Sequence, residues 1–254
     1  MKNERIHRSY ALFVVLICFL GIFFWTMQDS NAAQTSIERP RREIPLNKAL
    51  SKLLPAPKTV VEQENIGNKY RIAMTDVEFV KKRDIITKLF TTYPNLVAVL
   101  DVGGKFVSKK GVLTLTKKEF NPAIHHLIIT NHKNNVKRIG AFFLAECRSL
   151  LSLTLYPLIN LTSINGYFLA ECTKLKTLNL GCLHSVESIG HSFLANCRAL
   201  MHLDLKPLQN VRKIGQLFLS GCGHLKDVDF TQLHKVKRVT HPKPNTSGFE
   251  VIKD

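Results

Sequence analysis

The sequence predicts an α/β fold built as a solenoid, with a parallel sheet on its concave face and short helices on its convex face. The first observation behind this prediction is a period of 25 residues between residues 136 and 239, which places a cysteine at the same point in four successive units: Cys147, Cys172, Cys197 and Cys222. The second observation is that the same apolar positions recur around each of these cysteines. A unit of this length cannot bury its own apolar side, so the units must stack and share one core.

Each unit contains two apolar patterns. An L-x-L step, such as Leu153 and Leu155, places two side chains on one face of a strand. The I-G-x-x-F-L-x-x-C segment that follows separates residues such as Ile189 and Cys197 by eight positions, which suits one or two helical turns with their apolar side inward. The glycine of this segment predicts a sharp turn between strand and helix. Asn165 occupies that place in one unit, and asparagine also tolerates a left-handed backbone.

The stretch SVESIGHSFLANCRALMHLDLKPL (residues 185–208) resembles the BspA-like leucine-rich repeats. Units of that family carry S-V-x-x-I-G-x-x-A-F-x-x-C-x-x-L-x-x-I-x-I-P, and here Phe-Leu replaces Ala-Phe. The resemblance covers about 110 of the 254 residues. It implies a solenoid used for adhesion or protein recognition, often at cell surfaces, and it carries no catalytic residues over to this chain.

Residues 1–33 predict a single membrane or signal helix. A basic leader precedes the apolar run of residues 11–25, and a helix over the uncharged span of residues 9–28 would reach about 30 Å, enough to cross a bilayer. The same run also fits a long secretory signal that is cleaved near residues 30–33. Basic residues before the run keep the N-terminus in the cytosol. The repeats are therefore expected outside the cell or in a lumen, either tethered to the membrane or secreted.

Two glycosylation triplets, at Asn160 and Asn245, are compatible with that placement. Prolines and clustered charges predict a stem over residues 34–70, interrupted by a short amphipathic helix at residues 46–54.

Residues 71–121 predict an N-terminal α+β cap that covers the apolar end of the first repeat. Thr75 and Glu78 have the spacing of a capping box, so a helix is expected from there to about Phe90. Strands should follow, with turns at residues 103–104 and 109–111. Leucine-rich repeats are then expected over residues 122–240, before a polar tail at residues 241–254.

The net charge of +17 is spread along the chain, with +1 in residues 1–33, +8 in residues 34–120 and +8 in residues 121–254. Such a field favours a partner that is acidic in part. Basic pairs recur at the predicted strand-to-helix edge, and we define this basic edge as Lys137, Arg138, Arg212, Lys213, Lys237 and Arg238.

The variable positions of the predicted strands should line up about 4.8 Å apart and form the binding face. The candidate residues are Ser152, Thr154, Tyr156, Thr177, Asn179, His202, Asp204, Lys206, Asp227, Asp229 and Thr231. We interpret this face as the site of a non-enzymatic recognition protein that binds a protein or other macromolecule, with no cofactor and no small-molecule substrate expected.

Two other function classes stay open. Asp227-Val228-Asp229 has the D-x-D form of a metal site in luminal, glycosyltransferase-like membrane enzymes, although the repeat register already explains both aspartates as variable neighbours of a core valine. Binding of an anionic glycan or nucleic acid through diffuse charge is the other class. The four repeat cysteines are expected to be buried and structural rather than metal ligands, and Cys182 is the thiol expected to be more exposed.

Overall fold

The computed structural model describes residues 42–53, 70–226, 228–236 and 238–239. All of them lie in one compact unit, residues 40–254. The helix predicted for residues 1–33 lies outside the described residues. The same holds for the polar tail and for Asn245, Asp227 and Lys237.

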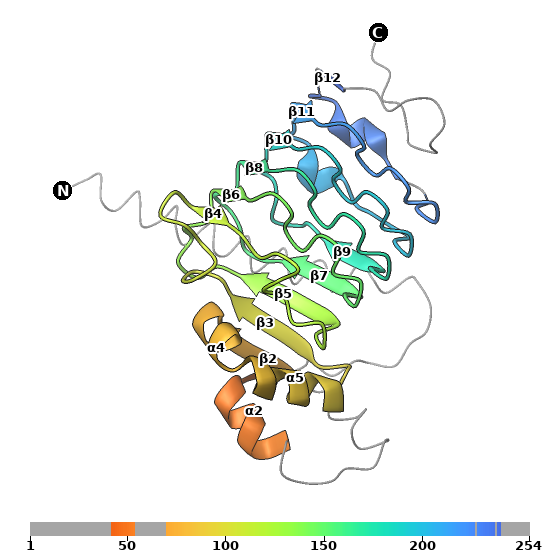
Figure 1. Cartoon of the computed structure of the whole chain (residues 1–254). Helices are drawn as coiled ribbons and strands as arrows, with labels where there is room; N and C mark the ends of the chain where they lie inside the picture. Colours follow the sequence, from red (N-terminus) through yellow and green to blue (C-terminus); the bar gives the residue numbers. More distant parts are fainter. Residues whose placement is uncertain (1–41, 54–69, 227, 237, 240–254) are drawn as a thin grey trace, which may run out of the picture. The chain divides into compact units, whose positions relative to one another are not determined.

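The described residues form two parallel sheets (Figure 1). Sheet A has the strand order β1-β2-β3-β5-β7-β9, and sheet B has the order β12-β11-β10-β8-β6-β4. The strands of sheet A are β1 (Arg42–Pro45), β2 (Tyr70–Thr75), β3 (Val97–Asp101), β5 (His126–Thr130), β7 (Ser152–Leu155) and β9 (Thr177–Asn179). The strands of sheet B are β4 (Val112–Leu113), β6 (Arg138–Ile139), β8 (Ser163–Ile164), β10 (Ser188–Ile189), β11 (Lys213–Ile214) and β12 (Arg238–Val239).

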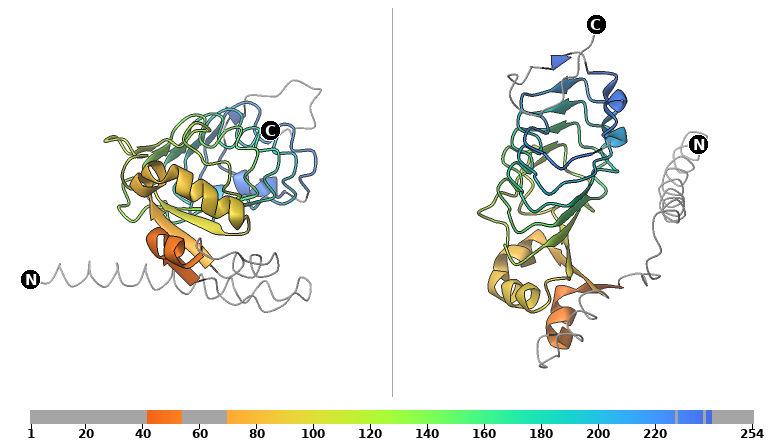
Figure 2. Two further views of the ribbon diagram at one scale, coloured as in Figure 1. Left: turned by 60° about the horizontal axis from the view of Figure 1, so that its bottom comes forward. Right: turned by 90° about the vertical axis from the view of Figure 1, so that its right-hand side faces the viewer.

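Successive repeats lie one on another as coils, and Figure 2 shows this stacking in its right-hand view. Each coil from β5 to β10 contributes one strand to each sheet, because β5, β7 and β9 pair in sheet A while β6, β8 and β10 pair in sheet B. Neighbouring strands pair equivalent residues of successive repeats, so that Leu153 lies beside Leu178 and Ile164 beside Ile189. The predicted 25-residue period is therefore the period of the coils.

The N-terminal part continues sheet A and adds helices. The predicted capping box is confirmed at α4 (Asp76–Lys81): Glu78 N donates to Thr75 Oγ1 at 3.2 Å, and Thr75 N donates to the Glu78 carboxylate at 3.0 Å. The single helix expected from there to Phe90 is two helices, because the backbone at Lys82 (φ −110°, ψ 27°) departs from helical geometry before α5 (Arg83–Thr92). The predicted turn at residues 109–111 is also confirmed, since Val107 and Leu113 flank it in an antiparallel bridge.

Part of the stretch predicted as a stem belongs to the fold. β1 pairs with β2 in parallel, and α2 (Leu46–Leu53) follows it directly. The amphipathic helix expected at residues 46–54 is thereby confirmed. Leu46 and Ala49 on this helix are 1% and 0% exposed. Pro45 fits this fold because it ends an edge strand, where a missing backbone N–H is tolerated.

The short convex-face helices expected at the I-G-x-x-F-L-x-x-C segments are absent from the described repeats, where a second sheet and tandem turns occupy those segments. In one repeat the residues Phe142, Leu144 and Glu146 have φ values of 59°, 49° and 57°, a left-handed conformation that no α-helix contains. Alternate backbone donors of these turns bond to neighbouring coils. In the next repeat, for example, Leu169 N donates to Phe143 O at 2.9 Å and Glu171 N donates to Ala195 O at 2.7 Å. Side chains spaced four and eight residues apart point inward in these turns as they would in a helix. The pattern therefore did not distinguish the two, and the predicted helices were wrong.

The shared core contains two ladders of identical side chains. The phenylalanine rings stack nearly parallel between neighbouring coils, with centroids 5.6, 5.0 and 5.3 Å apart along Phe143, Phe168, Phe193 and Phe218. The four repeat cysteines are at most 8% exposed. The Sγ of Cys172 donates to Leu144 O at 3.0 Å, and Cys197 and Cys222 make the equivalent bond one and two coils further on.

The glycines between strand and turn have a different role from the one predicted. A Cβ at Gly190 would lie 2.4 Å from Gly166 N, and a Cβ at Gly215 would lie 2.4 Å from His191 N. Neither glycine has a positive φ. The small side chain is therefore required by the close approach of successive coils, and the left-handed backbone occurs a few residues later at larger side chains.

Candidate recognition surface

The outward-facing side chains of sheet A form the predicted rows. The β7–β9 register places Ser152 beside Thr177 and Thr154 beside Asn179, while Leu153 between them points into the core. His126 on β5 extends the first row, and its Nδ1 lies 2.8 Å from Ser152 Oγ. The structure thus brings four predicted residues together on one face, namely Ser152, Thr154, Thr177 and Asn179.

Exposure differs along the predicted face. Ser152, Thr154 and Asn179 are half-buried, and Tyr156 keeps 39% of its surface exposed. The exposed members are Thr177, His202, Asp204, Lys206, Asp229 and Thr231. The face is therefore polar, with one large aromatic side chain in it.

Three of the predicted face residues close turns in successive coils. Asn179, Asp204 and Asp229 each accept, through Oδ1, the backbone N–H two residues further on, at 2.8, 2.8 and 3.0 Å. Such local bonds compete with the ladder of a sheet. The L-x-L pattern also predicts strands at residues 203–205 and, as Val228 and Phe230, at 228–230. Instead the chain leads into η2 (Lys206–Leu208) and η3 (Phe230–Leu233), and within the described residues sheet A has no strand beyond β9.

Asp229, which the sequence offers as half of a D-x-D metal site, has both carboxylate oxygens engaged. Thr231 N and Oγ1 donate to Oδ1, and Gln232 Nε2 donates to Oδ2 at 2.7 Å. The hydrogen bonds from Thr231 and then Gln232 lower the pKa of Asp229 below its usual value. Within the described residues, no group of three or more His, Cys, Asp or Glu side chains could hold a metal ion.

The predicted basic edge is not continuous. Arg138 and Lys213 belong to the same column of sheet B, but Ser163 and Ser188 separate them. The next column likewise has Thr162 and Glu187 between Lys137 and Arg212. The edge therefore splits into an N-terminal part (Lys137 and Arg138) and a C-terminal part (Arg212, Lys213 and Arg238).

The ladder cysteines have the environment of structural thiols. Burial raises the pKa of Cys172 to about 12 and that of Cys222 to about 11, and it raises the pKa of Cys147 and Cys197 as well. Cys182 is half-buried, the most exposed of the described cysteines.

An exposed aromatic cluster was missed by the sequence reasoning. Phe142 and Tyr167 stack with centroids 4.5 Å apart, and His191 meets the Tyr167 ring edge-on at the same distance. Phe142 is 53% exposed and Tyr167 is 37% exposed. Aromatic residues 25 positions apart in a variable slot were the signal that could have revealed this cluster.

The glycosylation candidate Asn160 is exposed, and its Nδ2 donates to Asn134 O at 2.9 Å. In the part of the chain that the structure describes, no helix has the length and apolar character needed to span a bilayer.

Two parallel sheets formed by stacked coils, with a polar row along one face, define a leucine-rich-repeat fold. Residues 116–240 match the family described as "BspA type Leucine rich repeat region" in six copies, so these residues are leucine-rich repeats of the BspA type. No curated protein matches the chain. Among solved structures, the chain is similar to the crystal structure of a T. pallidum leucine-rich-repeat protein (TpLRR), at 18% identity over 50% of this chain and 70% of that chain, with a TM-score of 0.32.

Proposed function

We propose that this chain is a non-enzymatic recognition protein that binds a macromolecular partner through the outward face of sheet A. Repeat proteins commonly bind through such faces, because stacking extends one surface over many units. The face comprises the rows that begin at Ser152 and Thr154 and continue through Thr177 and Asn179 toward Asp204.

The observation that carries this proposal is the position of Tyr156. It follows β7 directly and keeps 39% of its surface exposed beside the small polar rows. Tyrosine is enriched at protein interfaces, where its ring supplies apolar contact and its hydroxyl a hydrogen bond. A macromolecule that covers Tyr156 would also reach Thr154 and the exposed turn formed by Asp204 and Lys206.

The two parts of the basic edge would assist this binding by attracting an acidic partner from a distance. They lie on sheet B, so their contribution would be to the association rate rather than to direct contact.

The overall architecture of the repeats and their N-terminal cap is part of the same proposal. We infer that the coils form a solenoid and that α4, α5 and the first three strands of sheet A cap its N-terminal end. Buried side chains on both helices, such as Phe79 and Phe90, support the cap. The apolar run of residues 11–25 supports placement at a membrane or export from the cell, with the repeats outside or in a lumen.

Site-specific photocrosslinking tests the face, because it captures whatever macromolecule contacts the chosen position. A photoreactive residue replaces Thr177 on the face in one variant and Ser185 in the exposed turn between the sheets in the other. Both variants are expressed in the native cells, irradiated and analysed by mass spectrometry. The proposal expects a discrete adduct from position 177 only, and its loss on Tyr156→Ala. Equal adducts at both positions, or an adduct unchanged by Tyr156→Ala, would reject the sheet A face.

A further inference from the structure

A second surface, distinct from the face of sheet A, carries a dense positive charge. Residues 102–145 contain eight Lys and Arg residues but one acid, Glu119. Glu119 is bound locally, since Thr116 N donates to its carboxylate at 2.8 Å. Six of the eight basic side chains form what we call the basic loop surface. They are all exposed: Lys105, Lys109, Lys110, Lys133, Lys137 and Arg138.

Asn135 brings the three chain segments of this surface together. Its Nδ2 donates to Gly103 O at 3.3 Å, which joins it to the loop that carries Lys105. Its backbone oxygen lies against Gly111, where an added Cβ would approach it to 2.6 Å. Gly111 ends the hairpin turn that carries Lys109 and Lys110.

Glycines in both loops make room for the lysines of the third segment. A Cβ at Gly103 would lie 2.9 Å from Lys133 Cγ, and a Cβ at Gly111 would lie 3.0 Å from Lys137 Cγ. The carbonyl of Gly111 also accepts the backbone N–H of Lys137 at 2.8 Å and that of Arg138 at 3.0 Å. The three segments that carry these basic side chains therefore lie side by side, although their residues are up to 33 positions apart in the chain.

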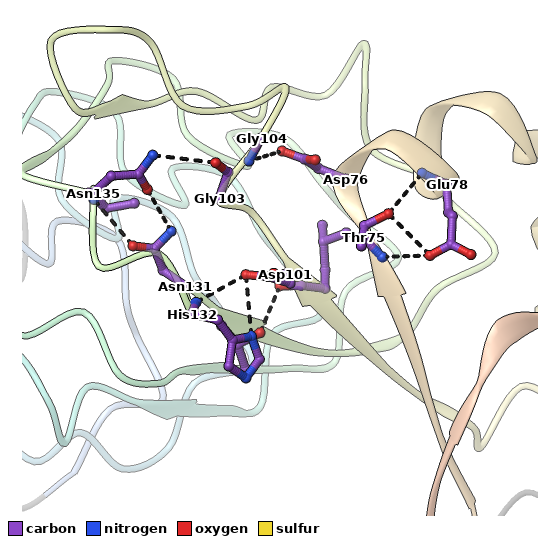
Figure 3. A network of polar contacts seen from close by, with 12 residues as sticks. Thr75, Asp76, Glu78, Asp101, Gly103, Gly104, Asn131, His132 and Asn135 are labelled. Carbon is purple, nitrogen blue, oxygen red and sulfur yellow. Dashed lines mark hydrogen bonds and ion pairs between the residues drawn. The ribbon is translucent and has the colours of Figure 1, made fainter.

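A polar network fixes these loops at the carboxyl ends of β2, β3 and β5 (Figure 3). The buried carboxylate of Asp76 accepts Gly104 N at 3.0 Å and Phe106 N at 2.9 Å. Asn131 Nδ2 donates to Asn135 Oδ1 at 2.9 Å, and Asp101 accepts His132 N at 3.1 Å. Asp76 and Asp101 are thus bound to backbone donors, and these bonds hold the loops of the positive surface in place.

We propose that the basic loop surface binds a linear anionic polysaccharide that carries sulfate or carboxylate groups along its length. None of the exposed large apolar side chains lies between residues 102 and 138, so the surface offers neither an exposed Phe, Tyr or Trp ring for stacking an unpaired base nor an apolar side chain for insertion into a bilayer. Five of the six cations are lysines, which act as hydrated point charges rather than as the bidentate fork that arginine presents to phosphate. Recognition by charge along a flexible polyanion fits these features. The predicted location of the repeats outside the cytosol favours a glycan over a nucleic acid.

The test uses the full chain in neutral detergent with heparin as the probe, and with duplex DNA and mixed micelles containing phosphatidylserine as competitors. The surface variant is Lys105→Gln/Lys109→Gln/Lys110→Gln. The matched control is Lys174→Gln/Lys176→Gln/Lys226→Gln, which removes the same charge at exposed lysines elsewhere. Affinity for immobilised heparin is measured between low and physiological salt, and thermal unfolding confirms that both variants fold.

The surface variant should bind heparin at least about 10-fold more weakly, with a shallower dependence on salt, while the control changes by less than about 3-fold. An equal loss in the control would mean that only the overall charge acts, and it would overturn the proposal. Tighter binding of DNA or of the anionic micelles than of heparin would overturn the assignment to a polysaccharide. Absence of saturable heparin binding at physiological salt would overturn it too. These outcomes are independent of the crosslinking test, because no residue of the sheet A face is altered.

Discussion

The ring of Phe193 lies parallel to the ring of Phe168, with centroids 5.0 Å apart and planes inclined by 8°, although 25 residues separate the two in the chain. Both rings are fully buried. Each coil therefore supplies one side of the packing site for the next, and no single repeat can complete its own core. The stability of the array and the alignment of its surface rows depend on the same contact.

Truncation of this ladder should destabilise the protein strongly. Phe193→Ala removes a ring packed between Phe168 and Phe218 and should lower the free energy of unfolding by about 3–5 kcal/mol, as for other buried aromatics. Denaturant unfolding of the two proteins measures the difference. Phe142→Ala is the matched control, because that ring is 53% exposed, and it should cost no more than about 1 kcal/mol. A loss below about 0.5 kcal/mol for Phe193→Ala would contradict the assigned packing.

Coil spacing should be sensitive to one methyl group at Gly190. Gly190→Ala places a Cβ 2.4 Å from Gly166 N, so the coils must separate, at a cost of about 1–3 kcal/mol. Gly223→Ala serves as the control, since a Cβ there meets nothing within 4 Å, and it should change stability by less than about 0.5 kcal/mol. Thermal denaturation of both variants compares them. Equal melting temperatures would show that the close approach of the coils is not a constraint.

The described cysteines should differ in their reactivity. Because burial raises the pKa of Cys172 to about 12 and that of Cys222 to about 11, the fraction of thiolate at about pH 8 is very small. Iodoacetamide applied to the native protein should therefore label Cys182 first and leave the four ladder cysteines unmodified, as peptide mass spectrometry can show. Labelling of Cys197 at the rate of Cys182 would disprove the buried ladder.

The capping box should make a small contribution that depends on pH. The backbone hydrogen bond from Thr75 lowers the pKa of Glu78 in the folded protein. Its contribution, at most about 1 kcal/mol, is therefore present above the unfolded pKa of about 4.3 and is lost as the pH falls through the lowered folded pKa. The difference in unfolding free energy between wild type and Glu78→Gln should accordingly be present at neutral pH and vanish in acid. Glu187→Gln, at an exposed glutamate, is the control, and a difference between wild type and Glu78→Gln that persists at about pH 2 would refute the assignment.

Much of the repeat region could be predicted from the sequence because its signal is local and repeated. The 25-residue register identified the buried cysteines and phenylalanines, the leucine-rich-repeat family and the rows that contain Ser152 and Thr154. The predicted helices were wrong, because inward spacing alone does not distinguish a helical turn from the tandem turns around Leu144. What the outward face binds stays a proposal.

The sequence alone was enough to determine which side chains face the shared interior, since only stacked units can bury apolar positions that recur every 25 residues. The tertiary structure decided which acceptors the backbone N–H groups of the turns bind and which basic segments lie next to one another. Glu171 N donates to Ala195 O one coil away, and the loop of Lys105 lies beside the segment of Lys137 because Asn135, in that segment, donates to Gly103 O. Such contacts join residues from different coils, and no pattern within a single repeat specifies them.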